Sequence, residues 1–215
     1  MENKKIIERF QLITQNHSVH SHERIVEQAC KGGIRWIQLR IKDKPFEMWK
    51  KQAAKTKEVC NFYRAKFIIN DHVAIAREIG AYGVHLGKDD MHSDDARKIL
   101  GDEAVIGATA NTFEEILRHV NNGVDYIGLC PYRHTKTKLN LSPILGLDGY
   151  ISIMDECKKH NINVPIIAIG GIQTEDIKDL LNIGIYGIAV SSAIINSEDI
   201  ARKSAEFLDI VNKHI

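Results

Sequence analysis

The sequence has few of the residues that build special sites. It contains four cysteines in 215 residues, and no two of them form a C-x-x-C pair. This spacing argues against a zinc ribbon or a redox motif, and scattered thiols are typical of a reduced, cytosolic protein. The longest apolar runs, such as Val164–Ile169, are far too short to cross a bilayer, and the N-terminus leads into no signal-peptide core. We therefore expect a cytoplasmic protein with no membrane partner.

An excess of either charge is also lacking. Twenty-nine Lys and Arg residues oppose 28 Asp and Glu residues, which leaves a formal net charge of +1. A balanced chain has no global field to attract nucleic acid, so any anion-binding site must be local. The length suits one domain, and we expect a single barrel domain over residues 1–215.

What the sequence does contain is a repeating pattern of two kinds of segment. Short apolar runs alternate with longer amphipathic segments, and such runs are typical of parallel strands buried between helices. Eight runs are predicted as strands: Phe10–Thr14, Ile34–Arg40, Lys66–Asn70, Gly83–Leu86, Ala104–Thr109, Asp125–Cys130, Val164–Ile169 and Gly187–Ser191. Five segments between and after them are predicted as helices: Glu23–Lys31, Pro45–Tyr63, Thr112–Asn122, Thr174–Asn182 and Ser197–Lys213.

This alternation leaves two architectures, a closed barrel and a doubly wound open sheet. An open dinucleotide-binding sheet usually has G-x-G-x-x-G after its first strand, whereas here the first strand is followed by Gln15, Asn16 and His17. We therefore predict the α/β class and a single (β/α)8 TIM barrel. Its active site should lie at the C-terminal ends of the strands.

The second strand ends in a group of long hydrogen-bond donors. Alternation sends Gln38, Arg40 and Lys42 to one side and Leu39 and Ile41 to the other. At a catalytic rim such a group suits an anionic ligand. A solvated strand end with ordinary surface bases is the alternative.

The third and fourth strands each deliver an acid to the same rim. Asp71 follows the third strand, and Asp90 follows the fourth. Protein carboxylates, together with substrate phosphates and water, are the usual ligands of Mg²⁺. Taken singly, Asp71 is more often a helix cap and Asp90 a turn residue, but beside Arg40 and Lys42 the pair favours a metal site.

Later strand ends carry residues that bind phosphate. Gly170-Gly171 follows the seventh strand and Ser191-Ser192 the eighth, the place where many barrels bind a phosphate group through main-chain N–H groups. Thr135, Thr137 and Lys138 follow the sixth strand in a basic segment, which could also be an exposed loop, and a long loop, Leu139–Gly149, comes after it. A hydroxyl at the end of the fifth strand, where Thr109 and Thr112 lie, could contact a ligand or cap the next helix.

Together these motifs resemble one family, the thiamine phosphate synthases. The resemblance covers nearly the whole chain, in family order, and rests on Gln38–Lys42, Ile69–Asp71, Gly83–Asp90, Ile106–Thr109, Thr135–Lys138, Ala168–Ile172 and Ala189–Ala193. It implies a Mg²⁺-dependent transferase that joins an aminopyrimidine methyl pyrophosphate to a thiazole phosphate, releasing pyrophosphate.

The resemblance also implies a role for each matching residue. Asp71 and Asp90 would hold Mg²⁺, and Arg40 and Lys138 would assist departure of pyrophosphate. The pyrimidine pyrophosphate would be bound by Gln38, Leu39, Arg40, Ile41, Lys42, Asn70, Thr109 and Lys138. The thiazole phosphate would be bound by Thr135, Lys136, Thr137, Gly171, Ser191 and Ser192.

The sequence departs from the family pattern at two positions and leaves two other functions open. Asn111 stands where many members have histidine, and His134 where many have proline, which puts the shape of the loop after the sixth strand in doubt. A thiazole tautomerase on the same barrel would lack the paired acids, and a non-catalytic metabolite sensor would need only the phosphate cradle. The expected partners are small-molecule substrates, and the sequence leaves open whether the protein is a homo-oligomer.

Overall fold

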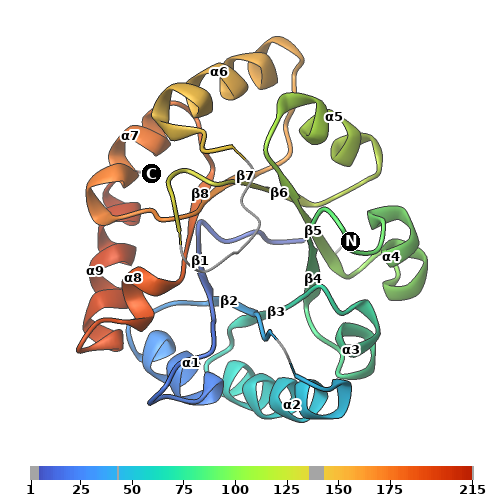
Figure 1. Cartoon of the computed structure of the whole chain (residues 1–215), viewed down its shortest axis with the longest axis vertical. Helices are drawn as coiled ribbons and strands as arrows, with labels where there is room; N and C mark the ends of the chain where they lie inside the picture. Colours follow the sequence, from blue (N-terminus) through green and yellow to red (C-terminus); the bar gives the residue numbers. More distant parts are fainter. Residues whose placement is uncertain (1–4, 43, 136–142, 215) are drawn as a thin grey trace.

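Eight parallel strands close into a barrel in chain order, with β8 pairing with β1 (Figure 1). The computed structural model describes residues 5–42, 44–135 and 143–214. The strands are β1 (Phe10–Ile13), β2 (Trp36–Leu39), β3 (Lys66–Asn70), β4 (Gly83–Leu86), β5 (Val105–Ala110), β6 (Tyr126–Leu129), β7 (Ile166–Ile169) and β8 (Gly187–Val190). The predicted (β/α)8 TIM barrel is therefore confirmed.

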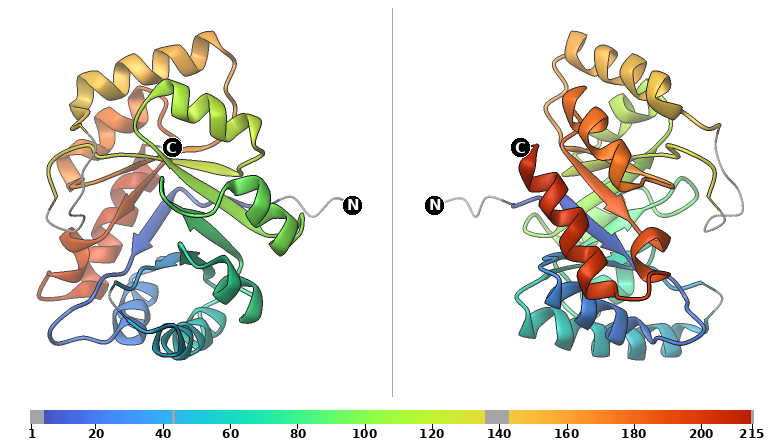
Figure 2. Two further views of the ribbon diagram at one scale, coloured as in Figure 1. Left: turned by 45° about the vertical axis from the view of Figure 1, so that its right-hand side comes forward. Right: turned by 90° about the vertical axis from the view of Figure 1, so that its left-hand side faces the viewer.

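Helices form an outer ring around the strands (Figures 1 and 2). They are α1 (His22–Lys31), α2 (Phe46–Phe62), α3 (Val73–Glu78), α4 (Ser93–Leu100), α5 (Phe113–Asn121), α6 (Gly146–Lys159), the 3-10 helix η1 (Thr174–Asp176), α7 (Ile177–Asn182), α8 (Ser192–Ile195) and α9 (Ile200–Lys213). None of the described helices is long and apolar enough to cross a membrane.

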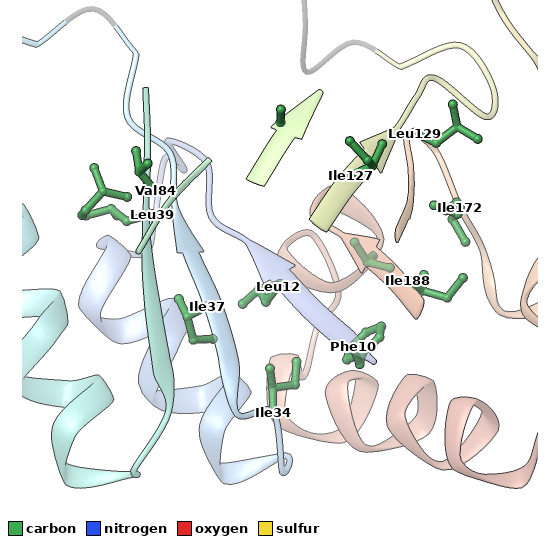
Figure 3. Close-up of a cluster of buried hydrophobic side chains, with 14 of the residues drawn as sticks. Phe10, Leu12, Ile34, Ile37, Leu39, Val84, Ile127, Leu129, Ile172 and Ile188 are labelled. Carbon is green, nitrogen blue, oxygen red and sulfur yellow. The ribbon is translucent and has the colours of Figure 1, made fainter. Parts of the chain in front are cut away.

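The larger core lies between the barrel and this ring. Strand residues that face outward, such as Leu12, Ile37 and Leu39, belong to one cluster of buried side chains (Figure 3). Ile25 of α1 and Phe207 of α9 are part of the same cluster. Both the strands and the helices contribute apolar faces, so removing this surface from water stabilises the layered arrangement.

A second, smaller core fills the barrel itself. Trp36 and Tyr126 meet edge to face, with ring centroids 5.0 Å apart, among inward-facing residues of the other strands. Gly107 makes room for them, because a Cβ atom there would lie 2.1 Å from the Tyr126 ring. The barrel is thus a packed core and not a channel, and a ligand must bind at one of its ends.

The predicted strands and helices match the structure except near their ends, and the structure adds α3, α4, α6 and α8, for which no range was predicted. The segment predicted as one helix from Thr174 begins as the 3-10 helix η1, which follows Gln173, and the Gln173 N–H donates to Asp176 Oδ2 at 2.7 Å. The last predicted helix, Ser197–Lys213, is confirmed as α9, which begins at Ile200, and the short helix α8 before it was not predicted. The loop predicted to reach Gly149 ends sooner, since α6 begins at Gly146, whose N–H donates to the carbonyl of Tyr132.

Candidate functional site

The end of β2 has the predicted alternation. Gln38 is buried inside the barrel, where its Nε2 donates to Gln11 Oε1 at 3.0 Å. Leu39 and Ile41 face the other way and are buried in the outer core, so their side chains are part of the packing between sheet and helices. Arg40 is half-buried and Lys42 is exposed at the rim.

A pocket of about 520 Å³ opens at this rim, between the ends of the first, second, sixth, seventh and eighth strands. Five of the residues predicted to bind substrate line it: Arg40, Lys42, Thr135, Gly171 and Ser192. Six others complete the lining: Gln15, Asn16, Arg133, His134, Gln173 and Asn196. The fold therefore joins the cationic end of β2 to the predicted phosphate cradle in one pocket.

Asp71 and Asp90 lie together beside that pocket. Burial and the adjacent Asp90 carboxyl, which hydrogen-bonds to it, raise the pKa of Asp71 from 3.8 to about 7, while Lys42 and Arg40 oppose this rise. Burial also lowers the pKa of Arg40, and here Asp71 acts in the opposite direction. Two carboxyl groups and two cations thus interact at the ends of β2, β3 and β4.

The backbone supports this arrangement of the two acids. Asp71 has φ of 67°, a conformation that non-glycine residues rarely adopt and that is often found at functional sites. Its N–H continues the sheet by donating to the carbonyl of His85 at 2.9 Å. The helix that follows begins after His72, so Asp71 is not its cap, whereas Asp90 does close a turn by accepting from the Gly87 N–H at 2.6 Å.

Polar side chains also lie inside the barrel below the rim. Asn70 is buried at the end of β3. Thr109 Oγ1 lies 3.0 Å from His85 Nε2, and His85 Nδ1 lies 2.9 Å from the Tyr126 hydroxyl. The N-cap of α5 is Thr112, whose side chain accepts a hydrogen bond from the Glu115 N–H. Thr109 therefore faces the barrel interior, below the site.

The loops after β6 and β7 are held together by an ion pair that the sequence did not reveal. Arg133 donates to Asp176 at 2.7 Å and to the carbonyl of Gly171 at 3.2 Å. The contact is so close that a Cβ atom on Gly171, where φ is 73°, would lie 2.4 Å from the Arg133 side chain. The cationic residues after β6 were visible in the sequence, but the acid that pairs with Arg133 lies 43 residues further along the chain. Lys136, Thr137 and Lys138 lie outside the described residues.

The remaining predicted residues follow β8. Ser191 directly precedes α8, and its Oγ donates to Gln15 Oε1 at 3.3 Å, which links the end of β8 to the loop after β1. Ser192 is the first residue of α8 and lines the pocket.

Asn111, a departure from the family pattern, has a clear structural role. Its side-chain amide donates to the carbonyl of Cys130 at 2.8 Å and to that of Pro143 at 3.1 Å. These carbonyls lie on either side of the segment after β6, so Asn111 ties both flanks of that segment to the end of β5.

Within the described parts of the chain, no group of three or more His, Cys, Asp or Glu side chains could hold a metal by itself. A metal at Asp71 and Asp90 would therefore need further ligands from substrate and water, as Mg²⁺ commonly takes. The rim has two acids, at least two cations and a glycine turn in or beside one pocket. Such a site can bind and orient phosphorylated molecules and stabilise charge.

Fold and site together define a (β/α)8 barrel with a pocket lined by cationic and polar residues at the C-terminal ends of its strands. A family model described as thiamine monophosphate synthase matches residues 10–194. The chain is 44% identical to a thiamine-phosphate synthase of Phocaeicola vulgatus, over 98% of this chain and all of that protein. It is 49% identical to the one of Flavobacterium johnsoniae, over 89% of this chain and 90% of that protein.

A solved structure agrees with these sequence matches. Thiamine phosphate pyrophosphorylase from Pyrococcus furiosus superposes with a TM-score of 0.85 at 29% identity, covering 96% of both chains. The chain belongs to the thiamine monophosphate synthase family and is a transferase of thiamine biosynthesis.

Proposed function

We propose that this protein joins 4-amino-2-methyl-5-(diphosphomethyl)pyrimidine to a thiazole phosphate, giving thiamine phosphate and pyrophosphate. Family membership supports this reaction. The observation that carries it is the pairing of Asp71 with Asp90 next to Arg40 and Lys42, on the rim that also holds Gly171 and the phosphate pocket. One pyrophosphate and one phosphate monoester need two anion sites within reach of each other, and in this proposal the Arg40–Lys42 cluster and the Gly171–Ser192 cluster supply them.

Mg²⁺ fits the pair of acids. The two carboxyl groups are close enough to disfavour ionisation of both, and a dication between them would relieve that repulsion. Asp71 and Asp90 would hold the ion, and the pyrophosphate oxygens would complete its coordination. When bound, Mg²⁺ offsets the negative charge that builds up on the departing pyrophosphate.

Arg40 and Lys42 bind the same pyrophosphate in this proposal, with Lys138 assisting. Gln38 and Asn70, which lie in or at the mouth of the barrel, contact the pyrimidine pyrophosphate from below, and Thr109 lies near the pyrimidine ring. Leu39 and Ile41 are buried, so they contribute only through their main chain.

The thiazole phosphate binds on the opposite side of the pocket. Gly171, Ser191 and Ser192 supply main-chain N–H groups, and Thr135, Lys136 and Thr137 bind the same phosphate. The Arg133–Asp176 ion pair supports this half of the site, because it fixes the loop after β6 against Gly171.

The proposed mechanism is dissociative. The bond between the methylene carbon and the pyrophosphate oxygen breaks first, and its electron pair leaves with pyrophosphate, whose charge Arg40, Lys42 and Lys138 stabilise. The aminopyrimidine ring stabilises the resulting cation, which the thiazole nitrogen captures. No protein nucleophile or general base is required, and the rate acceleration comes from positioning and charge stabilisation.

Measuring pyrophosphate release with both substrates and Mg²⁺ tests this proposal. We expect release that requires both substrates and is lost when Mg²⁺ is removed with a chelator. Isomerisation of the thiazole alone would identify a tautomerase instead. Calorimetric binding of thiazole phosphate without turnover would identify a sensor.

A further inference from the structure

The segment that carries Arg40 and Lys42 continues past the sheet. The β1–β2 ladder ends where the Thr14 N–H donates to the carbonyl of Gln38 at 2.8 Å. Beyond this point, side chains replace the main-chain partners. The Arg40 N–H donates to Thr14 Oγ1 at 3.1 Å, and the carbonyl of Lys42 accepts from Asn16 Nδ2 at 3.4 Å. Two side chains from the loop after β1 thus hold the main chain of the cationic segment.

One residue connects these two side chains. His22, the first residue of α1, is buried, with only 8% of its surface exposed. Its Nδ1 lies 2.9 Å from Thr14 Oγ1, and its Nε2 lies 3.2 Å from Asn16 Oδ1.

The donors and acceptors in this network have one consistent order. An amide oxygen only accepts, so the hydrogen on the neutral His22 ring lies on Nε2 and is donated to Asn16. Nδ1 then accepts from the Thr14 hydroxyl, which leaves a lone pair on Thr14 Oγ1 for the Arg40 N–H. Burial lowers the pKa of His22 to about 4, against the effect of Glu23, so the ring is neutral near pH 7.

We propose that His22 is a positioning residue for the pyrophosphate site, holding the main chain of Arg40 and Lys42 through Thr14 and Asn16. It touches no substrate itself. Arg40 and Lys42 have long, flexible side chains, and a fixed main chain limits the freedom that must be lost when they bind an anion. The role rests on the proposed function in that the ligand is taken to be pyrophosphate.

The first test compares two variants of α1. His22→Leu keeps a buried side chain but removes both ring nitrogens. Ile25→Val, three residues on in the same helix, disturbs packing and leaves the network intact. With His22→Leu we expect the KM for the pyrimidine pyrophosphate and the Kd for inorganic pyrophosphate with Mg²⁺ to rise about tenfold. The KM for thiazole phosphate should stay within about twofold, and Ile25→Val should change none of these constants by more than about twofold.

The second test does not depend on His22→Leu folding well. Thr14→Val removes the hydroxyl at nearly constant shape, whereas Thr14→Ser keeps it. We expect Thr14→Val to weaken pyrophosphate binding like His22→Leu and Thr14→Ser to restore it. Equal effects on both substrates, equal effects of Ile25→Val, or unchanged pyrophosphate binding in both His22→Leu and Thr14→Val would overturn the inference.

These outcomes separate the inference from the proposed function. A wild-type protein that binds pyrophosphate but does not join the two substrates would refute the proposed reaction. Pyrophosphate binding by the variants would still test the role of His22. A wild-type protein that turns over normally, with variants that bind pyrophosphate as it does, would refute the role of His22 alone.

Discussion

A buried or half-buried acid has different charged neighbours at the two ends of the barrel. At the N-terminal end, Asp125 accepts from Lys5 at 2.8 Å, from Arg97 at 2.6 Å and from the Ile106 N–H at 2.7 Å. At the C-terminal end, Asp71 meets another acid, Asp90, and its pKa rises. The Asp125 cluster pairs only opposite charges, whereas the Asp71 cluster also brings two like charges together.

This difference identifies which end has a role beyond folding. Compensated charges stabilise the fold by themselves, whereas a like-charge pair lowers stability unless a ligand neutralises it. The N-terminal end of a barrel generally serves stability and the C-terminal end catalysis, and here the electrostatics divide in the same way.

Asp71→Asn removes one of the two like charges at the C-terminal end, and it should have the largest effect on activity. The amide keeps the shape but cannot contribute a negative charge to a metal. We expect kcat/KM to fall by about 100-fold or more in steady-state assays, with a normal circular dichroism spectrum. Near-normal activity at limiting Mg²⁺ would show that Asp71 is not a metal ligand.

The same variant should be more stable than the wild type at neutral pH without metal. The raised pKa means that the folded protein holds the Asp71 proton more tightly than the unfolded chain does. The stability due to that proton is complete below about pH 4 and is lost as the pH rises through about 7. Asparagine mimics the protonated form, so its Tm advantage should be present at pH 8 and absent at pH 4. A lower Tm at pH 8 would contradict this account.

Asp125→Asn should give the reverse result at the N-terminal end. It leaves Lys5 and Arg97 without their anionic partner, and we expect a loss of about 2 kcal/mol in the free energy of unfolding, measured with urea. The values of kcat and KM should stay within about twofold. A large loss of kcat in a folded protein would show that the two ends are not separate in function.

Asp176→Asn should have a smaller and more selective effect at the C-terminal end. It weakens the ion pair to Arg133 that fixes the β6 loop against Gly171. We expect the KM for thiazole phosphate to rise by about five- to tenfold while the KM for the pyrimidine pyrophosphate changes little. Equal changes in both constants would mean that the pair supports the whole rim.

Thr112→Ala should have the smallest effect and show that a polar residue at the catalytic end can be purely structural. Its side chain caps α5. Losing the cap should cost about 1 kcal/mol in unfolding free energy and leave kcat/KM unchanged. Thr112→Ser, which keeps the cap, is the matched control.

The fold could be predicted because each strand is a short apolar run and longer amphipathic segments lie between the strands. The boundary that was missed at α6 depends on a contact distant in sequence. Gly146 starts α6 early because its N–H reaches Tyr132 on the far side of the loop.

The site was partly predictable for a similar reason. Strand alternation and the barrel rule place Arg40, Lys42, Asp71 and Asp90 on one rim without knowledge of any contact. The residues that hold this rim in place were missed. His22 is one histidine among ten, and only the structure shows that it bridges two side chains of the preceding loop.

A crystal structure with Mn²⁺ in place of Mg²⁺ and with pyrophosphate tests the central claim most directly, because Mn²⁺ can be located by its anomalous scattering. We predict one ion coordinated by Asp71 and Asp90, sharing pyrophosphate oxygens, with Arg40 and Lys42 on the same pyrophosphate. Pyrophosphate bound at the rim with no ion at these two acids, or an ion bound elsewhere, would contradict the account.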